Sequence, residues 1–425
     1  MLKVTKFGGS SLCDAAHFMQ VRDIVLSDVS RRVVVVSAAG KRHSADHKIT
    51  DLLYLCHAHL QYRVSCHELW RRICGRYIEI RDGCGLHTPV EQELEKIYAG
   101  LSPAVTQAEL ASRGEYLSAR LMADLLGYAF VDAVDWLQFD HAGNVVPEAS
   151  YAALQSLADG RKIVTPGFYG ALPSGAVHTF SRGGSDVTGA LAAAALHADV
   201  YENWTDVAGI LTADPKIVDA PRTIAQLSYA ELQALSQVGM QVLHESAVEP
   251  VRRRQIPLQI RDTSRPELAG TLIRCGCGEC PAADGVVGFA GRRGLAMLRL
   301  EQSAPLRYGE REILERAGLP VFSASEALGR RTLLVGVPSG GADTLHAAAE
   351  EIERTLHPAR LKLRENLAAL AVLYRGADAP SAVVDAVQGA GVPVHQMSGT
   401  APCLLLTVND SQYETALRAA YRAVF

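Results

Sequence analysis

Two short loops carry the residue types of an anion-binding site. Lys6-Phe7-Gly8-Gly9-Ser10-Ser11 places a lysine and two glycines between a β-prone segment and a helix start, and Ser181-Arg182-Gly183-Gly184-Ser185-Asp186 repeats the arrangement. A helix N-terminus presents unpaired N–H groups and a partial positive charge, and glycine lets the backbone approach a ligand closely. The first loop suits a phosphate, although an ordinary turn with a solvated lysine explains it equally well.

The second loop is more informative. The guanidinium of Arg182 can bind a carboxylate through two parallel hydrogen bonds, and Asp186 can help to hold Mg²⁺. Two such helix starts in one sheet predict a donor phosphate that faces an anionic acceptor. The chain has neither the Gly-x4-Gly-Lys-Ser/Thr motif of P-loop enzymes nor the His-Arg-Asp motif of protein kinases.

The elements around these loops alternate between strand and helix. Leu2–Phe7 and the β-branched run 32–37 flank a helix, and strands at 162–166 and 199–204 flank the small-residue helix 187–197. This alternation predicts an open, mostly parallel sheet covered by helices. Ligands of such sheets bind at the carboxyl ends of the strands, where both loops lie.

The pattern changes after a segment rich in Gly, Cys and Pro. At roughly 150 residues per domain, 425 residues predict two to three domains. We expect one α/β domain over 1–274, a linker over 275–285, and a region over 286–425 with two small α+β units at approximately 300–360 and 365–425. Each unit is too small to bury much apolar surface alone.

The composition argues against nucleic-acid-binding, membrane and secreted proteins. A net charge of −4 predicts no standing attraction to nucleic acid or to an anionic membrane. No apolar run reaches the length of a membrane span, and the first residues lack the core of a signal peptide. Nine cysteines form an odd count that favours reduced thiols, so we expect a cytoplasmic protein.

We expect no metal site built by cysteine or histidine. Cys275, Cys277 and Cys280 lack a second ligand pair, which favours a linker with reduced thiols. A helical segment also carries several cysteines and histidines among leucines, which we expect to divide between core and solvent; these are Cys56, His57, His59, Cys66 and His67.

Three stretches together resemble a known family. Lys6–Ser11, Ser181–Asp186 and Trp204–Lys216 resemble the signature stretches of aspartate kinases, in the amino acid kinase superfamily, and the C-terminal region resembles paired ACT domains. The resemblance implies an α/β amino acid kinase fold, with a mostly parallel central sheet and helices on both faces, followed by two small ferredoxin-like α+β ACT units. It also implies a homodimer or higher homo-oligomer formed through the ACT units.

The activity implied by the resemblance is ATP-dependent phosphorylation of the side-chain carboxylate of L-aspartate to 4-phospho-L-aspartate, the first step towards lysine, threonine and methionine. Mg²⁺ would assist. Lys6 and Asp186 are the implied catalytic residues, and Ser37, Thr50, Glu115 and Arg182 would bind aspartate. The nucleotide would contact Lys6, Gly8, Gly9, Ser10, Gly183, Gly184, Ser185, Thr205, Asp206 and Lys216.

Two positions depart from the family pattern. Gln241 stands where many members have a second active-site lysine, and Lys216 replaces an arginine, which keeps the charge but loses the planar fork. The turns that commonly receive an amino-acid effector are altered at 303–308 and 373–380, so lysine and threonine are both candidates and the existence of an effector site stays open.

Two alternatives remain open at this point. The chain could be a kinase of the same fold that serves a specialised pathway and phosphorylates an aspartate-like acid. It could also be a non-catalytic regulatory protein that binds nucleotide or amino acid, although it retains Lys6, Glu115, Arg182, Asp186 and Asp206.

Overall fold

The computed structural model describes residues 1–181, 183–238, 243, 245–275, 285–301, 309–327, 329–376, 380–399 and 401–425. Contacts divide the chain into two compact units. The first comprises Met1–Ile210, Ala225–Tyr229 and Leu243–Cys277, and the second comprises Leu211–Ile224, Ala230–Val242 and Gly278–Phe425. Arg182, Gln241, Cys277, Cys280, the whole of the altered turn at 303–308 and part of the one at 373–380 lie outside the described residues.

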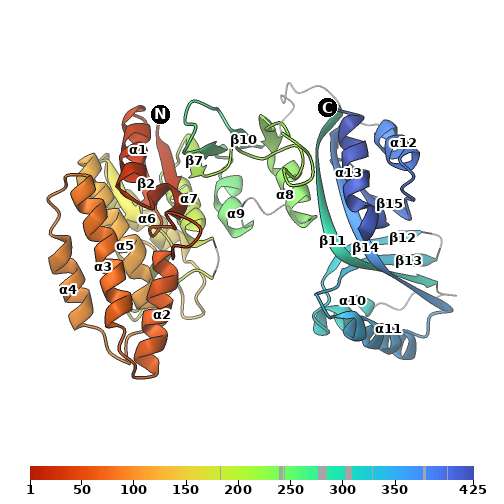
Figure 1. Cartoon of the computed structure of the whole chain (residues 1–425), viewed down its shortest axis with the longest axis horizontal. Helices are drawn as coiled ribbons and strands as arrows, with labels where there is room; N and C mark the ends of the chain where they lie inside the picture. Colours follow the sequence, from red (N-terminus) through yellow and green to blue (C-terminus); the bar gives the residue numbers. More distant parts are fainter. Residues whose placement is uncertain are drawn as a thin grey trace. The chain divides into compact units, whose positions relative to one another are not determined.

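The first unit contains most of the helices and all of the parallel strands (Figure 1). In chain order its elements are β1 (Lys3–Phe7), η1 (Gly9–Leu12), α1 (Ala15–Leu26), β2 (Arg31–Val36), α2 (Ile49–Gln61), α3 (His67–Gly83), α4 (Val90–Ala99), α5 (Gln107–Leu126), β3 (Ala129–Phe130), η2 (Ala133–Asp135), α6 (Pro147–Ala158), β4 (Ile163–Pro166), β5 (Tyr169–Ala171), β6 (Val177–Thr179), α7 (Gly184–Ala195), β7 (Val200–Thr205), β8 (Gln226–Ser228), α9 (Glu245–Arg253), β9 (Leu258–Asp262) and β10 (Thr271–Arg274).

Most of the described strands of this unit form one large sheet in the order β3-β4-β2-β1-β7-β9-β10-β8, whereas β5 and β6 form a separate antiparallel pair. Its ladders are parallel except for the antiparallel pair β9 and β10. Val33, Val34, Val35 and Val36 of β2 are all at most 1% exposed, because a strand in a parallel sheet is covered on both faces. The predicted fold class, a mostly parallel sheet with helices, is confirmed.

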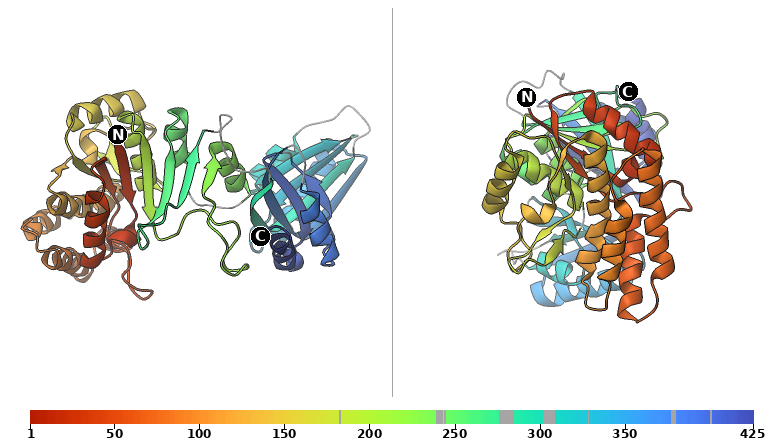
Figure 2. Two further views of the ribbon diagram at one scale, coloured as in Figure 1. Left: turned by 90° about the horizontal axis from the view of Figure 1, so that it is seen from above. Right: turned by 90° about the vertical axis from the view of Figure 1, so that its left-hand side faces the viewer.

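The spacing of leucines over 50–80 predicts a helical segment, and the structure divides it into two helices. These are α2 and α3, joined by a turn in which Arg63 has φ 56°. No Gly or Pro marks this turn, so local sequence gave no stop signal. Figures 1 and 2 show α2, α3 and α5 running side by side next to the sheet.

The second unit is built on an antiparallel sheet. Its elements are α8 (Tyr229–Gln237), which belongs to it from Ala230 onward, β11 (Gly285–Glu301), α10 (Glu310–Arg316), β12 (Val321–Ala327), β13 (Arg330–Gly336), α11 (Ala342–Leu356), β14 (Arg360–Arg375), α12 (Ser381–Gly389), β15 (Gln396–Ser398), β16 (Cys403–Asn409), η3 (Asp410–Gln412) and α13 (Tyr413–Arg422). The strand order over the described residues is β12-β13-β11-β14-β16-β15.

Two helix-covered cores lie on this antiparallel sheet, in addition to a smaller cluster of strand residues around Met297 and Leu367. One joins α10 and α11 to β11 and β13, and the other joins α12 and α13 to β14 and β16. The residues 392–396 read as a strand from the sequence, but the strand in the structure begins at Gln396, and Val392 contributes to the core from the segment after α12. Two helix-containing halves on one sheet agree with the predicted pair of small α+β units.

No helix among the described residues is long and apolar enough to cross a membrane.

Candidate active site

The candidate site lies where three parallel strands end. β1 is hydrogen-bonded to β2 on one side and to β7 on the other, so their carboxyl ends meet at one edge of the sheet. Lys6 near the end of β1 lies opposite Asn203 of β7 in the register. The loops that follow β1 and β2 therefore start at the same edge, and for the loop after Lys6 this is the position that the sequence predicted.

Lys6 is the centre of a buried polar cluster. Its side chain is largely buried, and its Nζ lies 2.6 Å from Oδ1 of Asp186. The Nδ2 of Asn203 donates to the same Oδ1 at 2.8 Å. Asp186 lies in the first turn of α7, so an acid at a helix N-terminus faces a lysine on a strand. The cluster holds the ammonium of Lys6 in one position at the sheet edge.

Close packing of α7 on β7 makes this contact possible. A Cβ on Gly189 would lie 2.4 Å from the hydroxyl oxygen of Tyr201, so only glycine fits there. The Tyr201 hydroxyl in turn donates to the carbonyl of Asp186 at 3.0 Å. The helix start is thus fixed to the strand that carries Asn203.

The loops after β1 and β2 touch through their backbones. The Gly40 amide donates to the Gly9 carbonyl at 2.8 Å, and a Cβ on Gly40 would lie 2.5 Å from that oxygen. The Gly8 amide donates to the Trp204 carbonyl at 3.2 Å. Among the described residues no acceptor is recorded for the amides of Gly9 and Ser10, so these two N–H groups are the ones open to a phosphate.

Glu115 places a buried carboxyl group beside the loop that follows β2. It lies on α5, and the residue is only 5% exposed. Oε2 has no hydrogen-bond partner in the described part of the chain. Burial raises the pKa of Glu115 to about 8, although the Ala38 amide partly opposes this shift. Such a carboxylate favours a cationic ligand that would pair with it.

Ser37 and Thr50 lie near the same loop. The Ser37 amide donates to the Phe7 carbonyl at 3.2 Å, which continues the pairing of β1 and β2 by one step. Thr50 lies in the first turn of α2, and the amide of Ile49 before it donates to the Ala39 carbonyl at 3.1 Å. Both side chains therefore start from backbone that is tied to the β2 loop.

The second predicted loop has the geometry of a helix start. Gly183 has φ 59°, in the left-handed region that glycine tolerates, and it precedes α7 directly. Gly184 has no room for a side chain, since a Cβ would lie 2.7 Å from the ring of Phe168. Ser185 follows, largely buried. The predicted carboxylate ligand Arg182 lies outside the described residues.

The predicted nucleotide residues do not all lie in one unit. Thr205 ends β7, and its hydroxyl donates to Oδ1 of the exposed Asp206 at 3.2 Å. Lys216 belongs to the second unit, where it is exposed and its amide donates to Oδ1 of Asp214 at 2.9 Å. Apart from Lys216, the predicted site residues that the structure describes all lie in the first unit.

Sequence reasoning missed two residues that support the site. Asn203 bridges Lys6 and Asp186, and the available signal was the pair of polar residues Glu202 and Asn203 inside a short strand flanked by aromatic residues. Thr263 follows β9, bonds the Ser11 hydroxyl at 2.7 Å and donates its amide to the Thr205 carbonyl at 2.8 Å. Nothing local in the sequence connects position 263 with the first loop.

The cysteines and histidines of α2 and α3 divide as predicted. Cys56 and Cys66 are buried, His57 and His59 are partly buried, and His67 is exposed.

Comparisons with known proteins agree with this architecture. Residues 1–262 match the family described as the amino acid kinase family. Over 454 aligned residues the chain is 31% identical to aspartokinase 3 of Bacillus subtilis (strain 168), with 100% of this chain and 99% of the relative covered.

Solved structures give the same result for the fold. The aspartate kinase of Clostridium acetobutylicum, an allosteric enzyme, is 34% identical with a TM-score of 0.89, and each chain is fully covered. E. coli aspartokinase III in complex with aspartate and ADP is 25% identical with a TM-score of 0.73, over 100% of this chain and 99% of that one. With its parallel sheet, its glycine loops and a family match over most of its length, the chain belongs to the amino acid kinase family.

Proposed function

We propose that this chain is an aspartate kinase, which transfers the terminal phosphoryl group of ATP to the side-chain carboxylate of L-aspartate and forms 4-phospho-L-aspartate. Similarity to aspartokinases along the whole chain supports the proposal. One structural observation carries it furthest: Oε2 of the buried Glu115 has no hydrogen-bond partner in the described part of the chain, and Glu115 lies beside the β2 loop, which touches the loop after Lys6. It favours an acceptor that bears an ammonium group, as an amino acid does.

Lys6 and the first glycine loop would serve the transferring phosphoryl group. Phosphoryl transfer depends mainly on positioning and on neutralising charge at the phosphoryl oxygens. Lys6 would supply a fixed cation, and the amides of Gly9 and Ser10 would donate hydrogen bonds. Asp186 and Asn203 would hold the Lys6 ammonium in place.

Glu115 would bind the ammonium group of aspartate, and Arg182 would bind its α-carboxylate, with Ser37 and Thr50 assisting. The side-chain carboxylate of the acceptor is already ionised near neutral pH, so no general base is needed to activate it. The nucleotide would contact the loop 183–185, Thr205, Asp206 and Lys216.

Mg²⁺ would fit beside Asp186. Hydrogen bonds and the ion pair recorded for this carboxylate involve Oδ1, which leaves Oδ2 as a hard oxygen ligand of the kind that Mg²⁺ prefers. When bound, the ion would neutralise phosphate charge.

The second unit would be the regulatory part. We propose a catalytic domain over 1–274, a linker over 275–285 and a regulatory region over 286–425 with two ACT-like units. These units would form the homo-oligomer and would bind an amino-acid effector. We also propose a cytoplasmic location. Two helix-covered halves on one antiparallel sheet support the regulatory role.

A hydroxamate assay tests the activity. Purified protein with ATP, Mg²⁺ and L-aspartate should yield acyl phosphate, which hydroxylamine traps. Lys6→Met should abolish the product, whereas Lys162→Met, which alters a lysine placed over the ring of Tyr128, should not. Turnover with L-glutamate or N-acetyl-L-aspartate as the acceptor tests whether the chain phosphorylates an aspartate-like acid instead of L-aspartate. No product with any acceptor at high enzyme concentration would refute a kinase function.

A further inference from the structure

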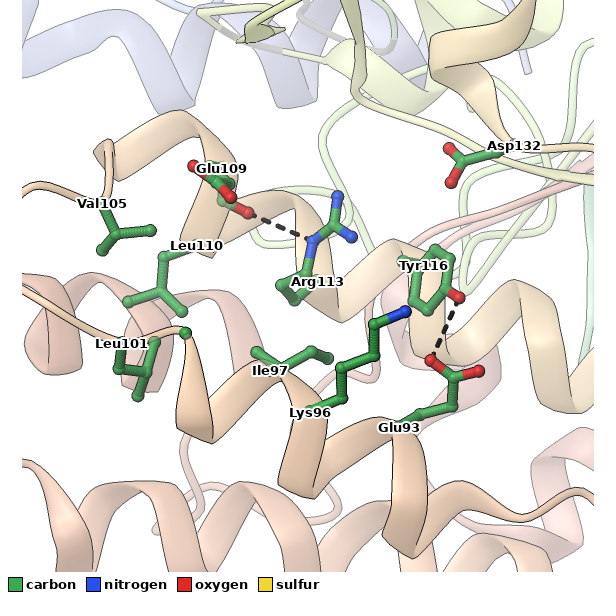
Figure 3. A pocket seen from close by; sticks show the side chains of 11 residues that line it. Glu93, Lys96, Ile97, Leu101, Val105, Glu109, Leu110, Arg113, Tyr116 and Asp132 are labelled. Carbon is green, nitrogen blue, oxygen red and sulfur yellow. Dashed lines mark hydrogen bonds between the residues drawn. The ribbon is translucent and has the colours of Figure 1, made fainter.

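A second cleft in the first unit lies apart from the candidate active site. It has a volume of about 310 Å³ and is enclosed by α4, the loop 100–105, the first half of α5 and Asp132. Figure 3 shows its side chains, with Arg113 of α5 in the middle and Lys96 of α4 below it. Arg113 precedes Glu115 by two residues, which on a helix corresponds to about 200°, so the two side chains leave α5 on different sides.

Two cations of this cleft lack a carboxylate partner. The guanidinium of Arg113 bonds the Ser112 hydroxyl at 2.9 Å and the Glu109 carbonyl at 3.3 Å. No ion pair is recorded for Arg113 or Lys96 in the described ranges. By contrast, Arg120 on the same helix pairs with Glu93 at 3.5 Å. Neither cation is thus paired with a carboxylate in the described part of the chain, although Glu93, Glu109 and Asp132 also line the cleft.

Arg113 is nevertheless held in place. Its guanidinium carbon lies 4.9 Å from the centre of the Tyr116 ring and 5.7 Å from that of Tyr169. A guanidinium positioned by two aromatic rings and by neutral hydrogen-bond acceptors keeps donors free for a carboxylate. This arrangement favours an anionic group over water.

An acid contacts the same Tyr169. Asp132 accepts a hydrogen bond from the Tyr169 hydroxyl at 2.7 Å, and no cation pairs with it among the described residues. Glu109 at the rim likewise has no recorded cation. An uncompensated cation and an uncompensated acid thus share one aromatic neighbour, which suits a ligand that carries both charges.

The rest of the cleft is apolar. Ile97, Leu101, Val105 and Leu110 line it, and the first three are only partly buried in the unliganded protein. We propose that this cleft binds an α-amino acid with an uncharged aliphatic side chain, whose carboxylate meets Arg113, whose ammonium meets Asp132 and whose side chain covers these four residues. This site would be separate from the aspartate site.

Equilibrium dialysis of the full-length protein with radiolabelled L-leucine tests the proposal without requiring activity. We expect saturable binding at one site per chain. Arg113→Gln should weaken it by about tenfold or more. The matched control Arg120→Gln changes an arginine of the same helix that already has a partner and should bind like the parent. If Arg113→Gln proves unstable, Lys96→Gln takes its place. It changes an exposed lysine of the same cleft and should also weaken binding.

The remaining outcomes decide the proposal as well. No saturable binding up to about 10 mM leucine, or equal binding by the parent and both charge variants, would overturn it. Displacement of leucine by L-aspartate would assign the leucine to the active site and would also overturn it. If 4-methylpentanoate, which lacks the ammonium group, competes as well as leucine, the proposal that the cleft binds a zwitterion is wrong. Weaker competition by this acid and by isopentylamine supports the zwitterion.

Discussion

Replacing Glu115 with glutamine should stabilise the unliganded protein in mildly alkaline solution while it removes affinity for aspartate. The reason is the position of this carboxyl group, which is buried without a hydrogen-bond partner for Oε2 in the described part of the chain. Its pKa is raised to about 8 from a usual value of 4.5. A glutamine of the same shape occupies the site without ever becoming charged.

The size of the effect follows from proton linkage. An acid whose pKa is raised by folding contributes stability below its unfolded pKa, and this stability is lost as the pH rises through the folded value. With pKa values of 4.5 and about 8, the ionisation of Glu115 costs about 2 kcal/mol at about pH 6 and nearly 5 kcal/mol at about pH 9. The stability difference between the glutamine variant and the parent should therefore grow by about 2.5 kcal/mol over this interval.

Glu202 provides the matched control. It is equally buried, but it pairs with Arg31 at 2.8 Å and with Lys3 at 3.1 Å, and its pKa is lowered. Glu202→Gln should destabilise the protein by several kcal/mol, because the buried Arg31 loses its carboxylate partner and Lys3 keeps only Asp28. Since Glu202 stays ionised from pH 6 to 9, this loss should barely change with pH.

Urea unfolding of the parent and both variants at several pH values measures these differences. A Glu115→Gln advantage that stays constant between pH 6 and 9 would refute the argument, because the carboxyl group would then not carry a raised pKa. A loss of stability in Glu115→Gln at every pH would show that the group has a partner in the unliganded state.

Three further predictions follow from the same site. Aspartate binding requires ionised Glu115, so its affinity, measured by calorimetry, should rise up to about tenfold per unit between about pH 6 and 8, whereas nucleotide affinity should not follow this profile. Gly40→Ala should cost several kcal/mol in urea unfolding and lower turnover, because the new methyl group would overlap the Gly9 carbonyl; Gly75→Ala, with open space around it, should have little effect. Gln241→Lys should leave kcat unchanged or raised, and a collapse of kcat would assign Gln241 a specific role.

The sequence determined the local chemistry of this protein. Strand, glycine pair and helix start follow from residues close together in the chain, and so do Lys6 and Asp186 as members of an anion site. The run of valines in β2 predicts a parallel sheet, because it makes the strand apolar on both faces. These features depend on period, turn chemistry and backbone N–H groups, which act over a few residues.

Only the tertiary structure decided which distant residues support that chemistry. Asn203 reaches Lys6 and Asp186 because β7 pairs with β1 in one register, and Thr263 reaches Ser11 because β9 lies beside β7. The charge state of Glu115 and the cleft around Arg113 likewise depend on burial and on neighbours from other elements. Desolvation and strand register are set by packing across the whole unit, so no local pattern in the sequence encodes them.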